Sequence, residues 1–426
     1  MKKSLLFLIA ATLLFSLLSV NTFAATVWDG TEDTSWFNTA QTEFTISTPQ
    51  ELAGLSKLAA GGEIFDGKTI KLGADIVMNA GSADTWKTTP PTNKWVPIAN
   101  FMGTFDGQNH TISGLYNSSL TSNNIALFAR VTGGTIKNVA IVNSFFAGNN
   151  TVASVVAEIT TLPGTVENVY SDAIVNGMDG TAGDPGFHVG GIIGKLNPGA
   201  ENSEIKGCWF DGTVDGKSKY VGGILGNGNS ISVTIRDCLN TGAISASDEA
   251  GGIIGRQGGN GTSITNCVNA GSITTNATGT SLADIVGMYK VGGTGFKMTI
   301  EKCYFDNATP TKKTHNSYDA NAVIEGSGAT GLATAKMKGE AAKTNMTDLD
   351  FTNKWATVAD GYAVPKGLLY MTASGESPVV TDPPANTTST GGGTTTTPPT
   401  GDVVFGVIIL TLAALASVAI FKKRRA

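Results

Sequence analysis

Apolar residues in the middle of this chain recur in short phrases that also carry paired glycines. The sequence Val-Gly-Gly-Ile-Ile-Gly occupies residues 189–194, and close variants start at Val221 and Ala250. The three starts lie 32 and 29 residues apart. Segments this short and rich in glycine do not favour a helix, whereas their β-branched residues favour strands. The pattern therefore predicts strands that repeat with a period of about 30 residues.

Two further phrases divide each repeat, so that each unit holds three short strands separated by turns. This content predicts an all-β fold, a right-handed parallel β-helix (solenoid) with one coil for each repeat of about 30 residues. A propeller is the alternative, but its blades need four strands and about 40 residues or more. The second phrase ends in cysteine or valine and occupies residues 136–139, 166–169, 205–208, 235–238, 264–267 and 300–303. The third phrase occupies residues 240–244 and 269–273.

The four cysteines test this fold, because Cys208, Cys238, Cys267 and Cys303 all occupy the same slot of successive units. Stacked coils place such residues in one interior column, nearly a strand spacing apart and pointing the same way. That geometry suits packed thiols better than a disulfide, and valine fills the same slot upstream. We therefore predict small buried core residues, with disulfides or a metal site as the alternatives.

The flanks of the repeats predict caps. Residues 25–100 are expected to form an N-terminal cap and lead-in coils, residues 101–310 the β-helix repeats, and residues 311–373 a C-terminal cap. A short helix is predicted after Thr48, which is the expected N-cap, with Pro49 in the first turn and Glu51 completing a capping box. Residues 333–342 predict another short helix. Such helices would cover the open edges of the terminal coils.

The two ends of the chain predict export and attachment. Residues 1–24 have the basic start, apolar core and small residues of a signal peptide, with cleavage at Ala24. Residues 374–397 are rich in Thr, Pro and Gly and predict an extended stalk. Residues 403–421 are apolar and long enough for a transmembrane helix, and four basic residues follow them.

The sequence Thr397-Pro398-Pro399-Thr400-Gly401, with the apolar span and basic tail behind it, resembles the LPXTG sorting signal of Gram-positive surface proteins. The resemblance implies that residues 398–426 are a cell-wall sorting signal. In that family a sortase cuts between the residues matched by Thr400 and Gly401 and joins the threonine to peptidoglycan. Thr397 departs from the family, which has leucine there. The alternative is a single-pass membrane protein that keeps its tail.

The repeated Gly-Gly-Ile-Ile-Gly and Gly-Gly-Ile-Leu-Gly phrases resemble the GLUG motif of bacterial surface proteins, with Ile192, Ile224 and Ile253 in place of its leucine. Residues 95–115 are similar to the lead-in coil of the same proteins. This resemblance implies a β-helix on a cell surface and, in most members, no assigned chemistry.

Composition and charge exclude some classes of function. The 54 glycines suit many tight turns, and a net charge of −5 gives no basic footprint for nucleic acid. The three histidines, His110, His188 and His315, lie in different units, and neither an HExxH nor a GxSxG motif occurs. We therefore expect no catalytic residues, no cofactor and no metal site.

The main alternative is a polysaccharide lyase or glycoside hydrolase, because a β-helix can align acids along a groove. Most of the candidate aspartates stand beside glycine, where turn chemistry explains them. The insertion at residues 177–188 and a set of aromatic residues offer binding surfaces instead, for an extracellular glycan or for a protein of a host or neighbouring cell. The sequence thus favours an adhesin, a glycan-contacting module or an envelope spacer. The candidate acids are Asp172, Asp179, Asp184, Asp211 and Asp215, and the aromatic residues are Trp209, Phe210, Tyr220, Tyr304 and Phe305.

Overall fold

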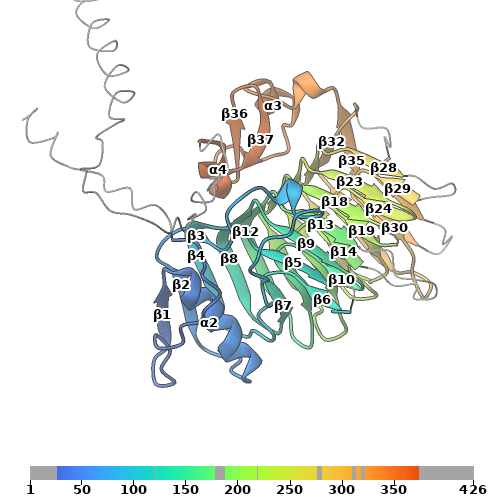
Figure 1. Cartoon of the computed structure of the whole chain (residues 1–426). Coiled ribbons are helices and arrows are strands. Elements are labelled where there is room, and N and C mark those ends of the chain that lie inside the picture. Colours follow the sequence, from blue (N-terminus) through green and yellow to red (C-terminus); the bar gives the residue numbers. More distant parts are fainter. Residues whose placement is uncertain are drawn as a thin grey trace, which may run out of the picture. The chain divides into compact units, whose positions relative to one another are not determined.

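The computed structural model describes residues 26–119, 121–177, 188–217, 219–275, 281–308, 313–317 and 322–373. Within these residues the chain forms a parallel β-solenoid, so the predicted β-helix is confirmed (Figure 1). Successive coils pair in parallel, and the one antiparallel strand pair of the described residues is a hairpin near the C-terminus.

The largest sheet contains a long ladder and a shorter second row that branches from β12. Because the same phrase recurs in each coil, identical positions stand above one another, as in the column Ile205, Ile235, Ile264 and Ile300. The ladder is β1 (Glu43–Ile46), β2 (Thr69–Leu72), β4 (Thr104–Ser113), β8 (Thr135–Val142), β12 (Thr165–Ser171), β16 (Ser203–Lys206), β21 (Val233–Arg236), β26 (Thr262–Thr265), β31 (Lys297–Glu301) and β34 (Val323–Glu325), with β3 (Ile76–Val77) beside β4. The second row is β17 (Trp209–Phe210), β22 (Leu239–Asn240), β27 (Val268–Asn269), β32 (Cys303–Asp306) and β35 (Ala329–Leu332).

Three further sheets complete the coils (Figure 1). The first is β5 (Tyr116–Ser119), β9 (Phe145–Gly148), β13 (Ile174–Gly177), β18 (Thr213–Gly216), β23 (Ala243–Ala246) and β28 (Ile273–Thr275). The second is β6 (Asn124–Ile125), β10 (Thr151–Val152), β14 (His188–Gly190), β19 (Val221–Gly222), β24 (Glu249–Gly251) and β29 (Ser281–Ala283). The third is β7 (Phe128–Val131), β11 (Val156–Ile159), β15 (Ile193–Leu196), β20 (Leu225–Asn227), β25 (Ile254–Gln257), β30 (Val286–Tyr289) and β33 (His315–Ser317).

The prediction of three strands in each coil is wrong, because two of the three expected strands are each divided by a bend into two shorter strands. The coil from Ser203 to Asn227 holds five strands, β16 to β20. Gly207 has φ +62° and separates β16 from β17. A Cβ on Gly222 would lie 2.0 Å from the Leu225 carbonyl oxygen, so the paired glycines allow a sharp bend between β19 and β20.

The cysteine column is interior, as predicted. Cys208, Cys238, Cys267 and Cys303 are free thiols with at most 1% exposure, and they belong to the main apolar core. Their Sγ atoms contact backbone carbonyl oxygens, as in the 3.4 Å contact from Cys238 to Arg236. Burial raises the pKa of the Cys208 and Cys267 thiols, which keeps them protonated.

The predicted N-terminal helix is confirmed as α2 (Pro49–Ala60). The Thr48 hydroxyl accepts a hydrogen bond from the Glu51 N–H at 3.2 Å, and the Glu51 carboxylate accepts one from the Thr48 N–H at 3.0 Å. Leu52 and Leu55 on this helix are fully buried in the main core beside Ile46. The helix therefore covers the open end of the first coil, and its two leucines extend the core there.

The C-terminal boundary at residue 310 is corrected, because β34 and β35 pair with the preceding coil and extend the solenoid to Leu332. The helix predicted at residues 333–342 is also wrong: it is two short helices, η2 (Thr334–Lys336) and α3 (Ala341–Asn345), with Gly339 at φ +54° between them. A hairpin, β36 (Trp355–Val358) and β37 (Gly361–Pro365), follows, and then η3 (Lys366–Leu368) and α4 (Tyr370–Ala373). We call residues 333–373 the C-terminal segment.

Several predictions fall on residues outside the described ranges. They are the signal peptide with its cleavage at Ala24, the stalk, the sorting signal with Thr400 and Gly401, and the span 403–421. In the described part of the chain, no helix has the length and apolar character needed to cross a membrane.

Candidate functional site

The C-terminal segment packs against the flank of the solenoid. Register aligns Ala140, Tyr170, Trp209, Leu239, Val268 and Tyr304 in one outward-facing column of the second row and of the strands before it. Apolar residues of the C-terminal segment cover this column; they include Met337, Trp355, Val364 and Leu368. Figure 1 shows the segment, in orange and red, beside these strands.

Two tyrosine hydroxyls hold the segment to the last coils. Tyr304 donates to Asp348 at 2.7 Å, and Tyr362 donates to Asp306 at 2.6 Å. Burial and the bond to Asp348 raise the pKa of Tyr304 to about 12, and burial and Asp306 also raise the pKa of Tyr362. Both phenols therefore remain neutral donors at ordinary pH.

A second column forms at the corner just before the valine or cysteine slot. Its members are Asn138, Asn168, Gly207, Asp237 and Asn266, and all have φ between +51° and +62°. Asparagine, aspartate and glycine tolerate this left-handed conformation better than other residues. Asn168 donates to the Asn138 side chain at 3.3 Å, and Asn266 donates to Asp237 at 3.3 Å. We call this column the corner ladder.

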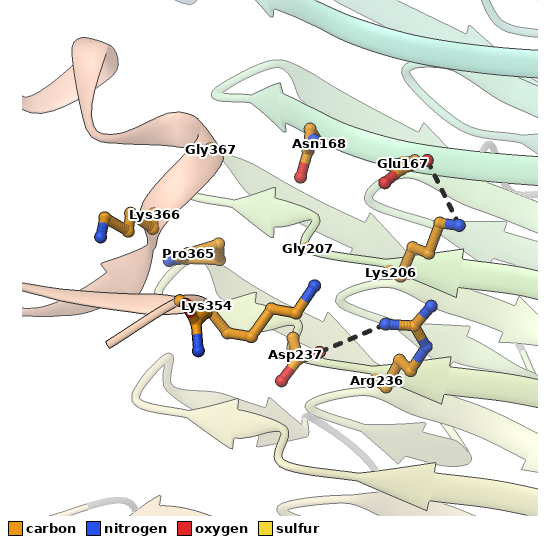
Figure 2. A pocket seen from close by; sticks show the side chains of 11 residues that line it. Glu167, Asn168, Lys206, Gly207, Arg236, Asp237, Lys354, Pro365, Lys366 and Gly367 are labelled. Atoms are coloured by element: carbon orange, nitrogen blue, oxygen red, sulfur yellow. Dashed lines mark ion pairs between the residues drawn. The ribbon is translucent and has the colours of Figure 1, made fainter. Parts of the chain in front are cut away.

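Gly207 interrupts the corner ladder and leaves a gap between Asn168 and Asp237. One end of the β36–β37 hairpin lies over this gap, and together they form a cleft of about 270 Å³ (Figure 2). A Cβ on Gly207 would lie 2.6 Å from the Asn168 Oδ1, so the glycine keeps the space open. The lining residues are Glu167, Asn168, Lys206, Gly207, Arg236, Asp237, Asn353, Lys354, Pro365, Lys366 and Gly367.

The cleft carries more positive than negative charge. Lys206 lies 3.3 Å from both Glu167 and Glu204, and Arg236 lies 3.6 Å from Asp237, whose side chain is only 8% exposed. Lys354 reaches from the C-terminal segment toward Asp237 (Figure 2) and has no ion pair within 4.0 Å among the residues that the structure describes. The lining thus contains four basic and two acidic residues in a chain whose net charge is −5. One of the four, Lys366, points away from the carboxylates and donates to the Thr352 carbonyl oxygen at 2.8 Å (Figure 2).

Chemically, the cleft offers amide, carboxylate, ammonium and guanidinium groups. These groups can donate and accept several hydrogen bonds to one small polar ligand. No histidine, serine or cysteine side chain lines it within the described residues, so it offers none of those nucleophiles.

The three predicted histidines lie apart from this cleft and from one another. His110 pairs with Asp75 at 3.2 Å, and His315 belongs to β33. His188 stacks on Tyr220 with ring centres 5.4 Å apart, and burial together with Lys195 lowers its pKa to about 3. His188 is therefore neutral, and its ring packs against Tyr220 on the outside of the solenoid.

The candidate aspartates are brought together only in part. Asp172 and Asp211 occupy one column on adjacent coils, because Ser171 and Phe210 before them are register partners. Asp172 accepts from the Asn143 N–H at 2.7 Å and Asp211 from the Thr241 hydroxyl at 2.5 Å, so each carboxylate bonds to a neighbouring coil. Asp215 does not share their column, because it lies on β18, 3.8 Å from Lys217. Asp179 and Asp184 lie outside the described residues.

The predicted aromatic surface is largely occupied. Trp209 and Tyr304 pack against the C-terminal segment, while Phe210 and Phe305 are buried. Tyr220 lies elsewhere, between His188 and the Arg256 guanidinium, which is 4.6 Å from its ring centre. Packing within the chain accounts for the positions of these aromatic residues.

The cleft residues Asn168, Gly207, Asp237 and Lys354 were not predicted as a site. A signal existed, because the residue before each valine or cysteine slot is Asn, Gly or Asp in five successive repeats. The position of Lys354 above Gly207 depends on the packing of the C-terminal segment, which the repeat pattern does not determine.

Comparison with known proteins gives limited matches. No protein-family model matches the chain. A stretch of 233 residues is 28% identical to halomucin of Haloquadratum walsbyi and covers 47% of this chain but only 2% of halomucin. A solved structure from Bacteroides ovatus, described as a "putative immunoglobulin A1 protease", aligns with 76% of this chain and 92% of its own, at 15% identity and a TM-score of 0.45. The resemblances to GLUG and LPXTG proteins stay predictions.

Proposed function

We propose that this chain is a cell-surface protein that acts by binding, as an adhesin or glycan-contacting module, and not by catalysis. The observation that carries the proposal is the polar cleft at Gly207, which the solenoid and the C-terminal segment build together. The similarity to halomucin supports an extracellular location. We also expect the coils to wind to the right, as crossovers between parallel strands almost always do.

Attachment is the second part of the proposal. The order of segments from residue 374 onward, a Thr/Pro/Gly-rich stretch, Thr400-Gly401, an apolar run and a basic tail, supports sorting to peptidoglycan after cleavage of the signal peptide at Ala24. The partners are then a sortase and the cell wall, and residues 403–421 hold the chain in the membrane until sorting.

Release from cells tests the attachment. Muramidase is expected to free the wild-type protein without residues 401–426, and detergent alone is expected to leave it on the wall. The variant Thr400→Ala is expected to reverse this, because the cut would be blocked and the apolar span would remain. Release of the wild type by detergent with Arg425 still attached would refute sorting and leave a membrane protein.

A polysaccharide lyase or glycoside hydrolase is the second candidate, and the stacked pair Asp172 and Asp211 is the observation in its favour. Asp211 lies at the surface, but neighbouring atoms shield its carboxyl from solvent, and this desolvation raises its pKa. A general acid needs a pKa raised in this direction. New reducing ends or unsaturated products from polysaccharides, lost in Asp211→Asn, would establish this activity. Unchanged polysaccharides would favour binding.

A further inference from the structure

We propose that the cleft at Gly207 binds a single sugar unit that carries a carboxylate, such as a uronic acid residue at the end of an acidic polysaccharide. This inference rests on the proposed binding function and names the ligand class.

The two walls of the gap favour a ligand that donates hydrogen bonds. In the uninterrupted part of the corner ladder, the Oδ1 of one residue accepts from the amide of the next, as Asn138 accepts from Asn168. Gly207, the next member of the corner ladder, has no side-chain amide. The Asn168 Oδ1 therefore faces the gap and receives no hydrogen bond from the ladder. On the other side stands the Asp237 carboxylate, which accepts from Asn266 at 3.3 Å, lies 3.6 Å from Arg236 and has no hydrogen to give. Two acceptor side chains therefore face one space, and the hydroxyl groups of a ligand can donate to both.

The rim of the cleft requires a negative charge as well. Lys206 and Arg236 already have carboxylate partners, whereas Lys354 has none within 4.0 Å among the described residues and extends over the gap (Figure 2). A carboxylate next to Lys354 would form a charge-assisted hydrogen bond, which is stronger than a neutral one. A simple anion lacks the hydroxyls, and a neutral sugar lacks the charge.

The size of the cleft limits the ligand. A volume of about 270 Å³ lies just below the range of about 300–1,000 Å³ that is common for small-molecule sites. Asn168 and Asp237 lie two coils apart, which is roughly 10 Å at the usual strand spacing. One sugar ring fits between them, whereas a longer chain would have to leave the cleft on its open side.

Titration calorimetry of the full-length chain in detergent tests the proposal with three probes. They are a disaccharide that ends in glucuronic acid, its methyl ester, and the matching disaccharide that ends in glucose. We expect the acid to bind at least about tenfold more tightly than the ester or the neutral sugar. Equal binding of acid and ester, or no binding of the acid, would overturn the proposal.

Two variants locate the binding. Gly207→Asn places in the gap the residue that other coils tolerate at the same φ. The end of the Asn168 side chain must shift to make room for the new Cβ, so we expect a small change in thermal stability and loss of binding. Lys354→Gln is expected to weaken binding of the acid at least about tenfold and to leave the ester unchanged. Lys343→Gln, an exposed lysine paired with Glu340 in the same segment, is the matched control and should bind as wild type.

The outcomes separate this inference from the proposed function. If Gly207→Asn folds and still binds the acid, the site is elsewhere and the inference fails. A failure of all three probes also overturns the inference, while cell-surface display is judged independently by release with muramidase.

Discussion

Helix α2 and the C-terminal segment were both predicted as caps, but they cover different surfaces of the solenoid. Helix α2 carries one apolar stripe, and Leu52 and Leu55 enter the main core at the first coil. The C-terminal segment passes the last coil and packs against the outer flank, over Leu239, Val268 and Tyr304. A 12-residue helix thus closes an end in one case, and a β-hairpin with short helices covers a side in the other.

The difference follows from where apolar residues stand in the strands. In ladder strands such as β16 and β21, alternation places the apolar side chains inside only. The second row differs because its outward face is apolar: Trp209 lies in the outward column beside the inward-facing Phe210. The inward positions of the next two coils are held by Asn240 and Asn269, which hydrogen-bond to each other at 2.7 Å. An outward apolar column of this length requires a cover. The C-terminal segment that provides this cover also forms the second wall of the cleft at Gly207.

The largest expected effect is on the flank cover. Trp355→Ala removes a fully buried side chain and should cost the C-terminal segment about 3–5 kcal/mol. Hydrogen exchange is expected to speed up across residues 337–371 while the ladder strands stay protected. Leu369→Ala, at a residue with 40% exposure in the same segment, is the control and should change little. Uniform loss of protection in the solenoid would mean that the segment is not a separate cover.

The end cap should respond differently. Leu55→Ala is expected to lower the free energy of unfolding by about 2–5 kcal/mol, because it leaves a cavity in the continuous core. Denaturant unfolding measures this, and Leu162→Ala, at a residue with 44% exposure, should shift stability by less than about 0.5 kcal/mol. An equal effect of both substitutions would contradict the packing of α2.

Alkaline pH should release the flank cover before the end cap. The folded pKa of Tyr304 is raised to about 12, above the usual value of 10, so its contribution is complete below pH 10 and is lost as the pH rises toward 12. The loss should be a few kcal/mol at most. Exchange of residues 337–371 measured from pH 9 to 12 should show it, and Tyr304→Phe should flatten the dependence. A cover that stays equally protected throughout would contradict the role of this hydroxyl.

The smallest expected effect is at the capping box of α2. Thr48→Ala removes the acceptor for the Glu51 N–H and should cost about 1 kcal/mol. Thermal unfolding measures it against Thr39→Ala, an exposed threonine whose side chain has no such role in the described structure. A loss no larger than that of the control would show that the box does not stabilise the helix.

Much of the fold could be predicted, because the repeated phrases determine the stacking register. The cysteine slot, the capping box and the parallel coils all follow from local pattern. The bends at Gly207 and Gly222 were missed because a glycine phrase does not show where the chain bends from one strand to the next. The cleft was missed because it depends on residues 237 and 354, which are far apart in sequence and meet only when the C-terminal segment folds onto the flank.

Hydroxyl-radical footprinting of the intact chain tests this arrangement most directly, at the outward residues Trp209, Leu239 and Tyr304. With the C-terminal segment on the flank, Leu239 and Tyr304 should be labelled as slowly as the interior residue Phe210, and Trp355→Ala should expose them. Labelling of Leu239 and Tyr304 in the intact chain at the rate of the exposed Leu162 would show that the flank is uncovered and that the cleft at Gly207 has no second wall.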